Sequence, residues 1–345
     1  MYKKNPDHQE EMDMKKMVKT LIIAGLMIAA ASSVFAAKKP KKSKKASAAK
    51  LITVGYAQVG AESDWRLANT TSFKETFTEA NGYKLIFDDA QQKQENQIKA
   101  IRSFIQQDVD YIVVAPVVET GWETVLQEAK KAGIPVILSD RQMTGVDDLY
   151  LCWVGGNFLQ EGRDGVKWLE AYLKKIGRDK DEICIVDLQG TIGASAQIGR
   201  TQGIEEGVAA HKNWKLVAQQ TGEFTQSKGQ EVMESILKST PKIDVVFAEN
   251  DNMAWGAVDA IKAAGKVPGK DIIIICFDAV HETFNKMMAG EINCAVECNP
   301  LHGPRVDEII KNLEAGKKIQ NKKQYVVEGV FDQENAKAEL PNRKY

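Results

Sequence analysis

The sequence predicts an α/β protein made of two doubly wound parallel-sheet lobes. From Leu51 onward, short apolar runs rich in β-branched residues alternate with amphipathic helical stretches. Runs that are apolar at successive positions indicate strands covered on both faces, as in parallel sheets. The alternation pauses after Gly156 and then restarts, and 345 residues exceed the usual size of one hydrophobic core. Two sheets of about five strands each therefore fit better than one sheet of about ten.

The predicted strands follow one another with helical patterns between them. The strands are 51–57, 83–90, 111–116, 135–140, 151–156, 182–190, 215–222, 245–250, 272–279 and 292–298. The helical patterns include 69–81, 96–107, 119–132 and 159–175. At Gly133-Ile134-Pro135, the glycine ends one helix and the proline opens the next strand. Repeated strand and helix in this order is the pattern of a doubly wound sheet.

The N-terminal segment has the pattern of a secretory signal peptide. Lys15, Lys16 and Lys19 precede the apolar run 21–31, and small residues follow up to Ala36. A positive flank, an apolar stretch and a small-residue end predict cleavage after Ala36 and a soluble periplasmic protein. A membrane anchor is the alternative, but the run is shorter than the roughly 20 residues that span a bilayer.

Composition and charge argue against several kinds of partner. The chain is 43% hydrophobic and 27% charged, as is ordinary for a soluble globular protein, and its formal net charge is −1. This balance gives no reason to expect nucleic acid or an anionic membrane as a partner. Lysines gather in the run KKPKKSKKASAAK, residues 38–50, which has no apolar periodicity. It predicts a solvated tether, with a polybasic membrane contact as the alternative.

The cysteines form an odd-numbered set, and they lie mostly inside apolar runs. They are Cys152, Cys184, Cys276, Cys294 and Cys298. Buried free thiols are the favoured interpretation, and one disulfide is the alternative in an oxidising compartment. Cys294 and Cys298 are about 13 Å apart in a strand, too far to pair with each other. No spacing of cysteine and histidine suits zinc, so no metal site is expected.

Hydrogen-bonding residues follow several of the predicted strands. Asp140 and Arg141 follow one strand, Asn250 ends another, and Asp278 lies near the end of a third. In open α/β sheets, ligands bind beyond the carboxyl ends of the strands. Two such sheets that face each other place both sets of strand ends around one cleft.

Further polar residues belong to the turns beside these strands. The first strand leads into a glycine turn and a helix start, where Ser63 or Asp64 is a candidate cap and Trp65 points back over the strand ends. Arg200 is expected to begin a helix after a glycine-rich loop. Each residue also has a structural interpretation, because aspartate at a strand end often caps the next helix and Trp65 is equally a core residue.

Taken together, these side chains match the needs of a neutral polyol ligand. Vicinal hydroxyls both donate and accept, so they require carboxylates as acceptors and guanidinium or amide groups as donors. An aromatic plane such as that of Trp65 covers the apolar C–H face of such a ligand. The sequence therefore predicts a sugar-binding cleft.

The same residues do not form the constellation of an enzyme. The four histidines lie beside no evident nucleophile, and the common nucleotide, hydrolase and metalloprotease motifs do not occur. Asp140 and Asp278 could be imagined as a glycosidase pair, but their Arg and Asn neighbours would hold them ionised. No catalytic residue and no cofactor are therefore expected.

At these positions the chain resembles the periplasmic sugar-binding proteins of ABC importers related to ribose-binding protein, and within them the galactofuranose binders. The resemblance runs from about Leu51 to the end of the chain. The motifs that carry it are VGAESDWR (59–66), QQKQENQIKAIRSF (91–104), APVVETGWE (115–123), DLQGTIGAS (187–195), GEFTQSKGQEVMES (222–235) and ENDNMAWGA (249–257). QQKQENQ and the TGW after APVV are shared with the galactofuranose binders rather than with ribose binders at large.

The resemblance implies a set of sugar contacts. On the N-lobe, Glu62, Ser63, Asp64, Trp65 and Arg66 would line the cleft, and Asp140 with Arg141 would clamp ring hydroxyls. On the C-lobe, the implied contacts are Arg200, Asn250 and Asp278, with Phe224 as an apolar wall. Glu297 or Cys298 takes the place of a glutamine of the ribose binders. Because side chains alternate along a strand, only one of these two faces the cleft, and Glu297 is favoured. Asp64 replaces a glycine of the galactofuranose binders, which puts the pocket rim and the ligand in doubt.

The resemblance also implies a domain plan and partners. Three strands cross between the lobes near 155–157, 298–300 and 323–325 and form a hinge, and sugar closes the cleft. The implied parts are the signal peptide 1–36, the tether 37–50, an N-lobe of 51–155 plus 299–324, and a C-lobe of 156–298 plus 325–345. The expected partners are a monosaccharide and an ABC transporter permease, for a monomeric protein.

Other functions of this fold remain alternatives. A sensor role, presenting sugar to a chemoreceptor or a sensor kinase, fits the same features. Sugar-responsive repressors share the fold but carry an N-terminal helix-turn-helix, where this chain has a leader and a tether.

Overall fold

The computed structural model describes residues 50–345. The predicted signal peptide and all but the last residue of the predicted tether lie outside the described residues. Within the described part, no helix is long and apolar enough to cross a membrane.

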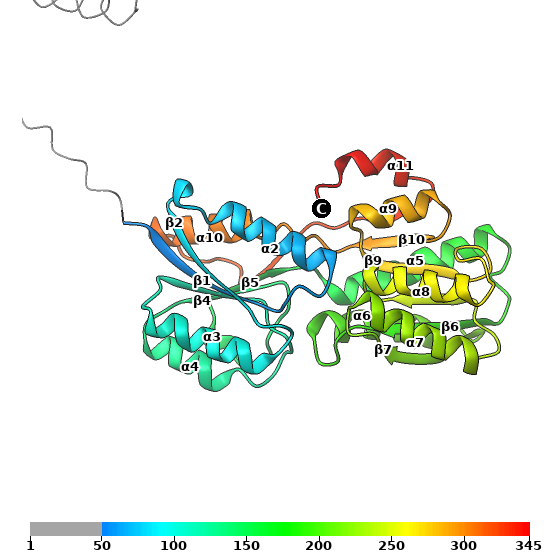
Figure 1. Cartoon of the computed structure of the whole chain (residues 1–345), viewed down its shortest axis with the longest axis horizontal. Helices are drawn as coiled ribbons and strands as arrows, with labels where there is room; N and C mark the ends of the chain where they lie inside the picture. The colour runs from blue at the N-terminus through cyan, green and yellow to red at the C-terminus, as the bar shows by residue number, and fades with distance from the viewer. Residues whose placement is uncertain (1–49) are drawn as a thin grey trace, which may run out of the picture. The chain divides into compact units, whose positions relative to one another are not determined.

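The first sheet has the order β11-β5-β4-β3-β1-β2, and every pair in it is parallel (Figure 1). Its strands are β1 (Ile52–Gln58), β2 (Tyr83–Asp89), β3 (Tyr111–Val114), β4 (Val136–Ser139), β5 (Cys152–Gly155) and β11 (Lys323–Tyr325). Alternate residues of β3 belong to separate cores: Ile112 and Val114 to one, Tyr111 and Val113 to the other. Both faces of this sheet are therefore covered, which explains why its strands are apolar throughout.

Two pairs of helices cover the first sheet, one pair on each face. They are α2 (Asp64–Thr76) with α10 (Gly303–Glu314), above the sheet in Figure 1, and α3 (Gln94–Gln106) with α4 (Glu123–Lys131), below it. The close fit of α3 depends on Gly55, because a Cβ there would lie 2.5 Å from the Phe104 ring.

The second sheet has the order β12-β10-β9-β8-β6-β7 and is parallel except for the antiparallel edge strand β12. Its strands are β6 (Ile183–Gln189), β7 (Trp214–Thr221), β8 (Val245–Ala248), β9 (Ile273–Asp278), β10 (Cys294–Glu297) and β12 (Val330–Asp332). The predicted class, α/β with two parallel-sheet lobes, is confirmed.

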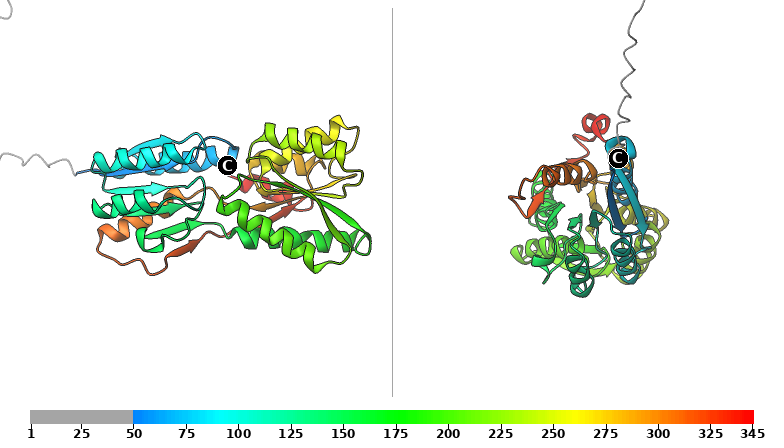
Figure 2. Two further views of the ribbon diagram at one scale, coloured as in Figure 1. Left: turned by 90° about the horizontal axis from the view of Figure 1, so that it is seen from below. Right: turned by 90° about the vertical axis from the view of Figure 1, so that its left-hand side faces the viewer.

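Helices also pack on both faces of the second sheet (Figure 2). On one face lie α5 (Phe158–Lys175) and α6 (Ser195–Ala210), and on the other lie α7 (Gln226–Ser239), α8 (Asp251–Ala263), α9 (His281–Met288) and the short α11 (Ala336–Glu339). Helices α5 and α6 touch through glycines: a Cβ on Gly162 would lie 2.6 Å from the Arg200 carbonyl oxygen. This close approach fixes the part of α6 that carries Arg200.

The chain crosses between the two sheets three times. It leaves the first sheet after β5, returns after β10 to form α10 and β11, and crosses again from β11 to β12. The third crossing was expected at 323–325, but Lys323–Tyr325 is a strand of the first sheet and the link to the second sheet is 326–329.

Several element boundaries also differ from the predictions. Ser63, one of the two candidate caps, accepts a hydrogen bond from the Arg66 amide, so α2 begins at Asp64, five residues before the helical pattern 69–81. Helix α6 begins at Ser195, which places Arg200 in its second turn instead of at its start. The three-residue strands β11 and β12 carry too few apolar residues to be recognised from sequence. All five cysteines are buried and free, as favoured.

Candidate functional site

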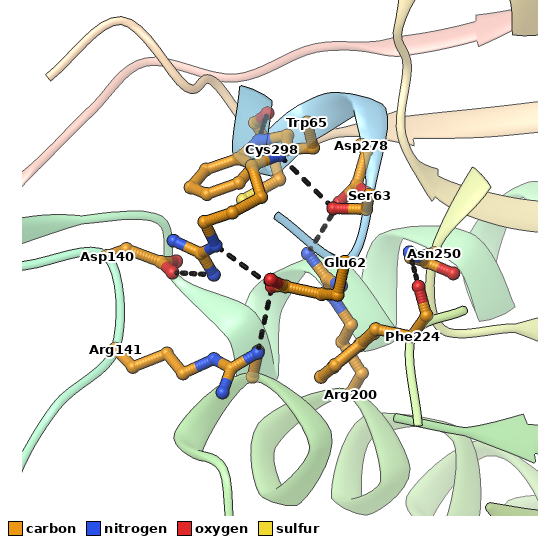
Figure 3. Close-up of a pocket in the computed structure, with 12 residues that line it drawn as sticks. Glu62, Ser63, Trp65, Asp140, Arg141, Arg200, Phe224, Asn250, Asp278 and Cys298 are labelled. Carbon is orange, nitrogen blue, oxygen red and sulfur yellow. Dashed lines mark hydrogen bonds and ion pairs between the residues drawn. The ribbon is translucent and has the colours of Figure 1, made fainter. Parts of the chain in front are cut away.

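A small, largely buried pocket lies where strand ends of both sheets meet. Figure 3 shows its lining, which consists of Glu62, Ser63, Trp65, Arg66, Asp140, Arg141, Ala196, Arg200, Phe224, Asn250, Asp278 and Cys298.

Trp65 forms the aromatic wall on the first-sheet side. The Ser63 cap starts α2 at the pocket, so the first turn of the helix presents Trp65 and Arg66. The indole Nε1 of Trp65 donates to the Cys298 carbonyl oxygen at 2.6 Å, across a hinge crossing. The Arg66 guanidinium lies 4.6 Å from the ring centroid. These contacts hold the indole plane in one orientation.

Arg66 is the centre of a buried ion network. Its Nε lies 2.9 Å from Glu62 Oε1, and its Nη1 donates to Gln58 at 3.2 Å. Its Nη2 lies 2.7 Å from Asp140 Oδ2, an ion pair whose angles are not those of a hydrogen bond. Burial lowers the pKa of Arg66, but Asp140 and Glu62 outweigh it and leave the pKa above its ordinary value. Arg66 is therefore a fixed cation.

Arg141 is the more weakly paired arginine of this side. Its Nη1 donates to the Val117 carbonyl oxygen at 2.8 Å, and its Nη2 is 3.8 Å from Glu62. Burial and then the nearby Arg66 lower the pKa of Arg141 to about 10, so it is charged at neutral pH. Its guanidinium lies 5.1 Å from the Phe224 ring centroid, so the two sides of the pocket touch here. Arg141 is therefore a cation with donor capacity left for a ligand.

Arg200 and Asp278 supply the opposing charges on the second-sheet side. Arg200 Nε donates to Glu161 Oε2 at 2.8 Å, and Nη2 lies 3.4 Å from Asp278 Oδ1. Arg200 also donates to the Glu249 carbonyl oxygen. Burial holds the pKa of Asp278 well above its ordinary value although Arg200 opposes that rise, so the arginine does not by itself keep this carboxyl ionised, contrary to the expectation from sequence.

Asn250 and Phe224 are joined by a hydrogen bond. Asn250 caps α8 by accepting from the Met253 amide at 2.9 Å, and its Nδ2 donates to the Phe224 carbonyl oxygen at 2.9 Å. One N–H of the amide is therefore left to donate to a ligand. The Phe224 ring packs on Gly190, where a Cβ would lie 1.9 Å from a ring carbon.

Three of the lining residues have left-handed backbone. The φ angles are 65° at Asp140, 62° at Phe224 and 104° at Asp278. Non-glycine residues rarely adopt this conformation, and it concentrates at functional sites because the surrounding structure must enforce it. At Asp140 the enforcement is visible, since its amide donates to the Val154 carbonyl oxygen and its carbonyl oxygen accepts from Trp153 Nε1. These turns aim both carboxylates into the pocket.

The network leaves acceptor capacity that points to a ligand. Glu62 Oε2 and Asp140 Oδ2 are buried and accept no hydrogen bond. Buried carboxylate oxygens without hydrogen bonds are costly, so they favour a bound donor. Hydroxyl groups satisfy such oxygens and also accept from the nearby guanidinium and amide groups.

A second buried cluster lies beside the pocket at the hinge. Ligand atoms of Glu161, Cys298 and Glu328 lie within 4.8 Å of one another, and of the described residues these alone group in a way that could hold a metal ion. A Cβ on Gly156 would lie 2.4 Å from Glu161 Oε1 and 2.6 Å from Glu328 Oε1. Burial and then Glu161 raise the pKa of Glu328 to about 9. One proton shared by the two carboxyl groups lowers the charge of the pair to −1, and Arg200, whose Nη2 lies 2.8 Å from Glu161 Oε2, balances that charge.

The structure brings every predicted site residue into the pocket lining except Asp64 and Glu297. Asp64 lies outside, where its carboxylate accepts from Asn252 of α8. Glu297 faces away and accepts from Arg343, from the Tyr345 hydroxyl and from the Gly329 amide. The alternation argument was sound, but the choice between its two residues was wrong.

Of the lining residues, Cys298 was considered in the sequence analysis but not chosen, and Ala196 was missed. Cys298 takes the position expected for Glu297, and the acceptors that draw Glu297 away lie far along the chain. Ala196 carries no sequence signal, because a small residue beside a pocket has no distinctive chemistry.

Comparisons with known proteins agree on one family. Residues 54–302 match the family described as periplasmic binding protein domain. The galactofuranose-binding protein YtfQ of Escherichia coli K12 is 43% identical over 298 residues, which is 85% of this chain and 92% of that protein.

Solved structures extend this similarity. A Mycobacterium smegmatis protein in complex with β-D-fucofuranose is 49% identical, with a TM-score of 0.81, covering 85% of this chain and 95% of that one. The binding protein of an arabinose ABC transporter from Shewanella sp. ANA-3, bound to α- and β-L-arabinofuranose, is 46% identical. Its TM-score is 0.79, again with 85% and 95% coverage. This chain belongs to the periplasmic sugar-binding protein family.

Proposed function

We propose that the protein captures a monosaccharide in its furanose ring form and delivers it to the permease of an ABC importer. The observation that carries the proposal is the pocket lining, in which paired carboxylates and guanidinium groups surround one indole ring. It acts by binding, not by catalysis, as the members of its family do.

Each polar side chain has a role toward a sugar. Asp140 would accept from ring hydroxyls, while Arg66 and Arg141 donate to them. From the other lobe, Asp278 would accept, and Arg200 and Asn250 would donate. Glu62, whose buried Oε2 accepts no hydrogen bond, would also accept from a hydroxyl. Trp65 and Phe224 would enclose the apolar face of the ring, with Ser63 beside them.

The furanose form is supported by the relatives. One is named for galactofuranose, one is bound to fucofuranose and one is bound to arabinofuranose. These sugars differ in their exocyclic atoms and share a five-membered ring, so the ring is the feature that a common pocket would recognise.

Capture would depend on closure of two lobes about the hinge. We assign residues 51–155 plus 299–325 to one lobe and 156–298 plus 326–345 to the other, which moves the last boundary of the sequence analysis by one residue so that β11 stays whole. Contacts such as the Arg141–Phe224 approach join opposite sides of the pocket, as in a closed state. A permease that recognises the closed surface would then distinguish the loaded protein. Export by the leader peptide to the periplasm, as a monomer, completes the proposal.

Deoxy sugars can test the ring form by calorimetry. 5-Deoxy-D-galactose can cyclise only to a furanose, and 4-deoxy-D-galactose only to a pyranose. We expect D-galactose, L-arabinose and the 5-deoxy sugar to bind, and the 4-deoxy sugar not to bind. Binding of the 4-deoxy sugar alone would refute furanose selection, and no saturable binding by any of them would refute sugar capture.

A further inference from the structure

Asp64 and Asn252 join the two lobes directly, outside the pocket. The Asp64 amide donates to Asn252 Oδ1 at 3.1 Å, and Asn252 Nδ2 donates to Asp64 Oδ2 at 2.7 Å. Asp64 is the first residue of α2 on the first sheet, and Asn252 is the second residue of α8 on the second. Both ends of one amide therefore pair with one residue of the opposite lobe.

We infer that this pair, the Asp64–Asn252 latch, sets the affinity for sugar without touching it. The inference rests on the proposed sugar capture. Neither residue lines the pocket, although Ser63 and Trp65 flank one of them and Asn250 lies two residues before the other. The latch thus sits at the edge of the site, on the same two helix starts that carry the sugar contacts.

The latch can raise affinity because it exists only when the lobes meet. In an open state both groups are hydrated, and the two hydrogen bonds form on closure. Any interaction made only in the closed state shifts the equilibrium toward it, and so it strengthens binding of a ligand that needs closure. The latch should therefore slow the dissociation of the sugar, because its two hydrogen bonds must break before the sugar can leave.

Two other hydrogen bonds between the two sides, both away from the hinge crossings, are of a different kind. The Gln142 amide donates to Ser195 Oγ at 2.8 Å, and the Glu119 amide donates to the Gly193 carbonyl oxygen at 3.0 Å. Both use main-chain donors, and one uses only main-chain atoms. In the Asp64–Asn252 latch, the oxygen and the nitrogen of the Asn252 side-chain amide each form one hydrogen bond to Asp64. Substitution of Asp64 can remove one of these bonds, and substitution of Asn252 can remove both.

Single and double variants give a graded test with L-arabinose as the probe. Asp64→Ala removes one hydrogen bond and should weaken affinity about threefold to tenfold, while Asn252→Ala removes both and should weaken it about tenfold to thirtyfold. The double variant should match Asn252→Ala, because no partner remains for Asp64. Asp64→Asn retains both hydrogen bonds and should stay near wild-type affinity.

Controls separate the latch from general damage. Glu75→Ala removes an exposed carboxylate of the same helix and should leave affinity unchanged. The melting temperature of each variant without sugar should match the wild type, and the loss should appear in the dissociation rate. Unchanged affinity in Asn252→Ala, or equal losses in Asp64→Asn and Asp64→Ala, would overturn the inference.

A cross-link tests the meeting of the two residues without relying on sugar. In the variant Asp64→Cys/Asn252→Cys, oxidation should join the two positions, as shown by peptide mapping, while the native cysteines are buried. L-arabinose should speed this reaction. If the cross-link forms although L-arabinose does not bind, the contact between the two residues is supported and only the proposed sugar capture is refuted. Failure to link under any condition would refute the latch.

Discussion

Asp140→Asn is the sharpest perturbation of the proposed sugar site. It removes the negative charge of a carboxylate that is 3% exposed and keeps its shape. Asparagine also tolerates the left-handed backbone at this position, where φ is 65°. Arg66 retains Glu62 at 2.9 Å and Gln58 at 3.2 Å, so the variant should fold.

The expected loss follows from the chemistry of the contact. A hydrogen bond to a charged group contributes about 1.5–3 kcal/mol, compared with about 1 kcal/mol for a neutral one. Replacing the charged acceptor by a neutral one should therefore cost about 0.5–2 kcal/mol for a hydrogen bond to the sugar, which weakens binding about 2- to 30-fold. Asp140→Ala should lose at least as much affinity and should also unfold more easily, because alanine at positive φ costs about 1–2 kcal/mol.

Isothermal titration calorimetry with L-arabinose measures the change. The matched control is Asp148→Asn, which neutralises an exposed carboxylate paired with Lys130 at 3.2 Å on the same lobe. That control should bind as the wild type does, since exposed ion pairs contribute little. A change of less than twofold in Asp140→Asn would remove Asp140 from the site.

Three further predictions concern the hinge, the aromatic wall and export. Burial and then Glu161 hold the pKa of Glu328 at about 9 in the folded state, above its ordinary 4.5. The folded state therefore keeps a proton that the unfolded state loses, and the free energy of unfolding should fall as pH rises from about 5 to about 9. Denaturant unfolding of Glu328→Gln should show a shallower decline, and identical pH profiles would contradict the shared proton. Gly190→Ala places a Cβ 1.9 Å from the Phe224 ring, so it should cost about 1–3 kcal/mol of unfolding free energy and weaken sugar binding; unchanged calorimetry would show that the ring is not a wall of the site. Mass spectrometry of exported protein should find a mature N-terminus near Ala37, and retention of the apolar run before it would refute cleavage there.

Much of the pocket could be predicted because parallel sheets present their strand ends at one edge. Asp140, Asn250 and Asp278 are far apart in sequence, yet each follows a strand whose apolar run is plain to see. The rule that ligands bind beyond carboxyl strand ends was enough to bring these residues together.

The positions of Asp64 and Glu297 could not be predicted, because they depend on hydrogen bonds to residues far away in the sequence. The partner of Asp64 is 188 residues away, and one of those that draw Glu297 out of the cleft is 46 residues away. Alternation along a strand limits which neighbours share a face, but it does not say which face is the pocket. Glu297 turns away from the pocket because Arg343 and Tyr345 donate hydrogen bonds to it. Sequence periodicity does not predict such contacts between distant parts of the chain.

The left-handed turns of the pocket bear on how its specificity could be redesigned. At Asp140, Phe224 and Asp278, most substitutions would place a residue with an unfavourable left-handed backbone. Library variants at these positions would therefore lose folding stability whether or not they bound a new ligand. Trp65 lies on an ordinary helix, where a side chain can be exchanged without backbone strain, whereas Arg66 on the same turn must stay as the cation of Glu62 and Asp140. Directed evolution toward another sugar should therefore advance through the first turn of α2 and leave the strand-end turns fixed.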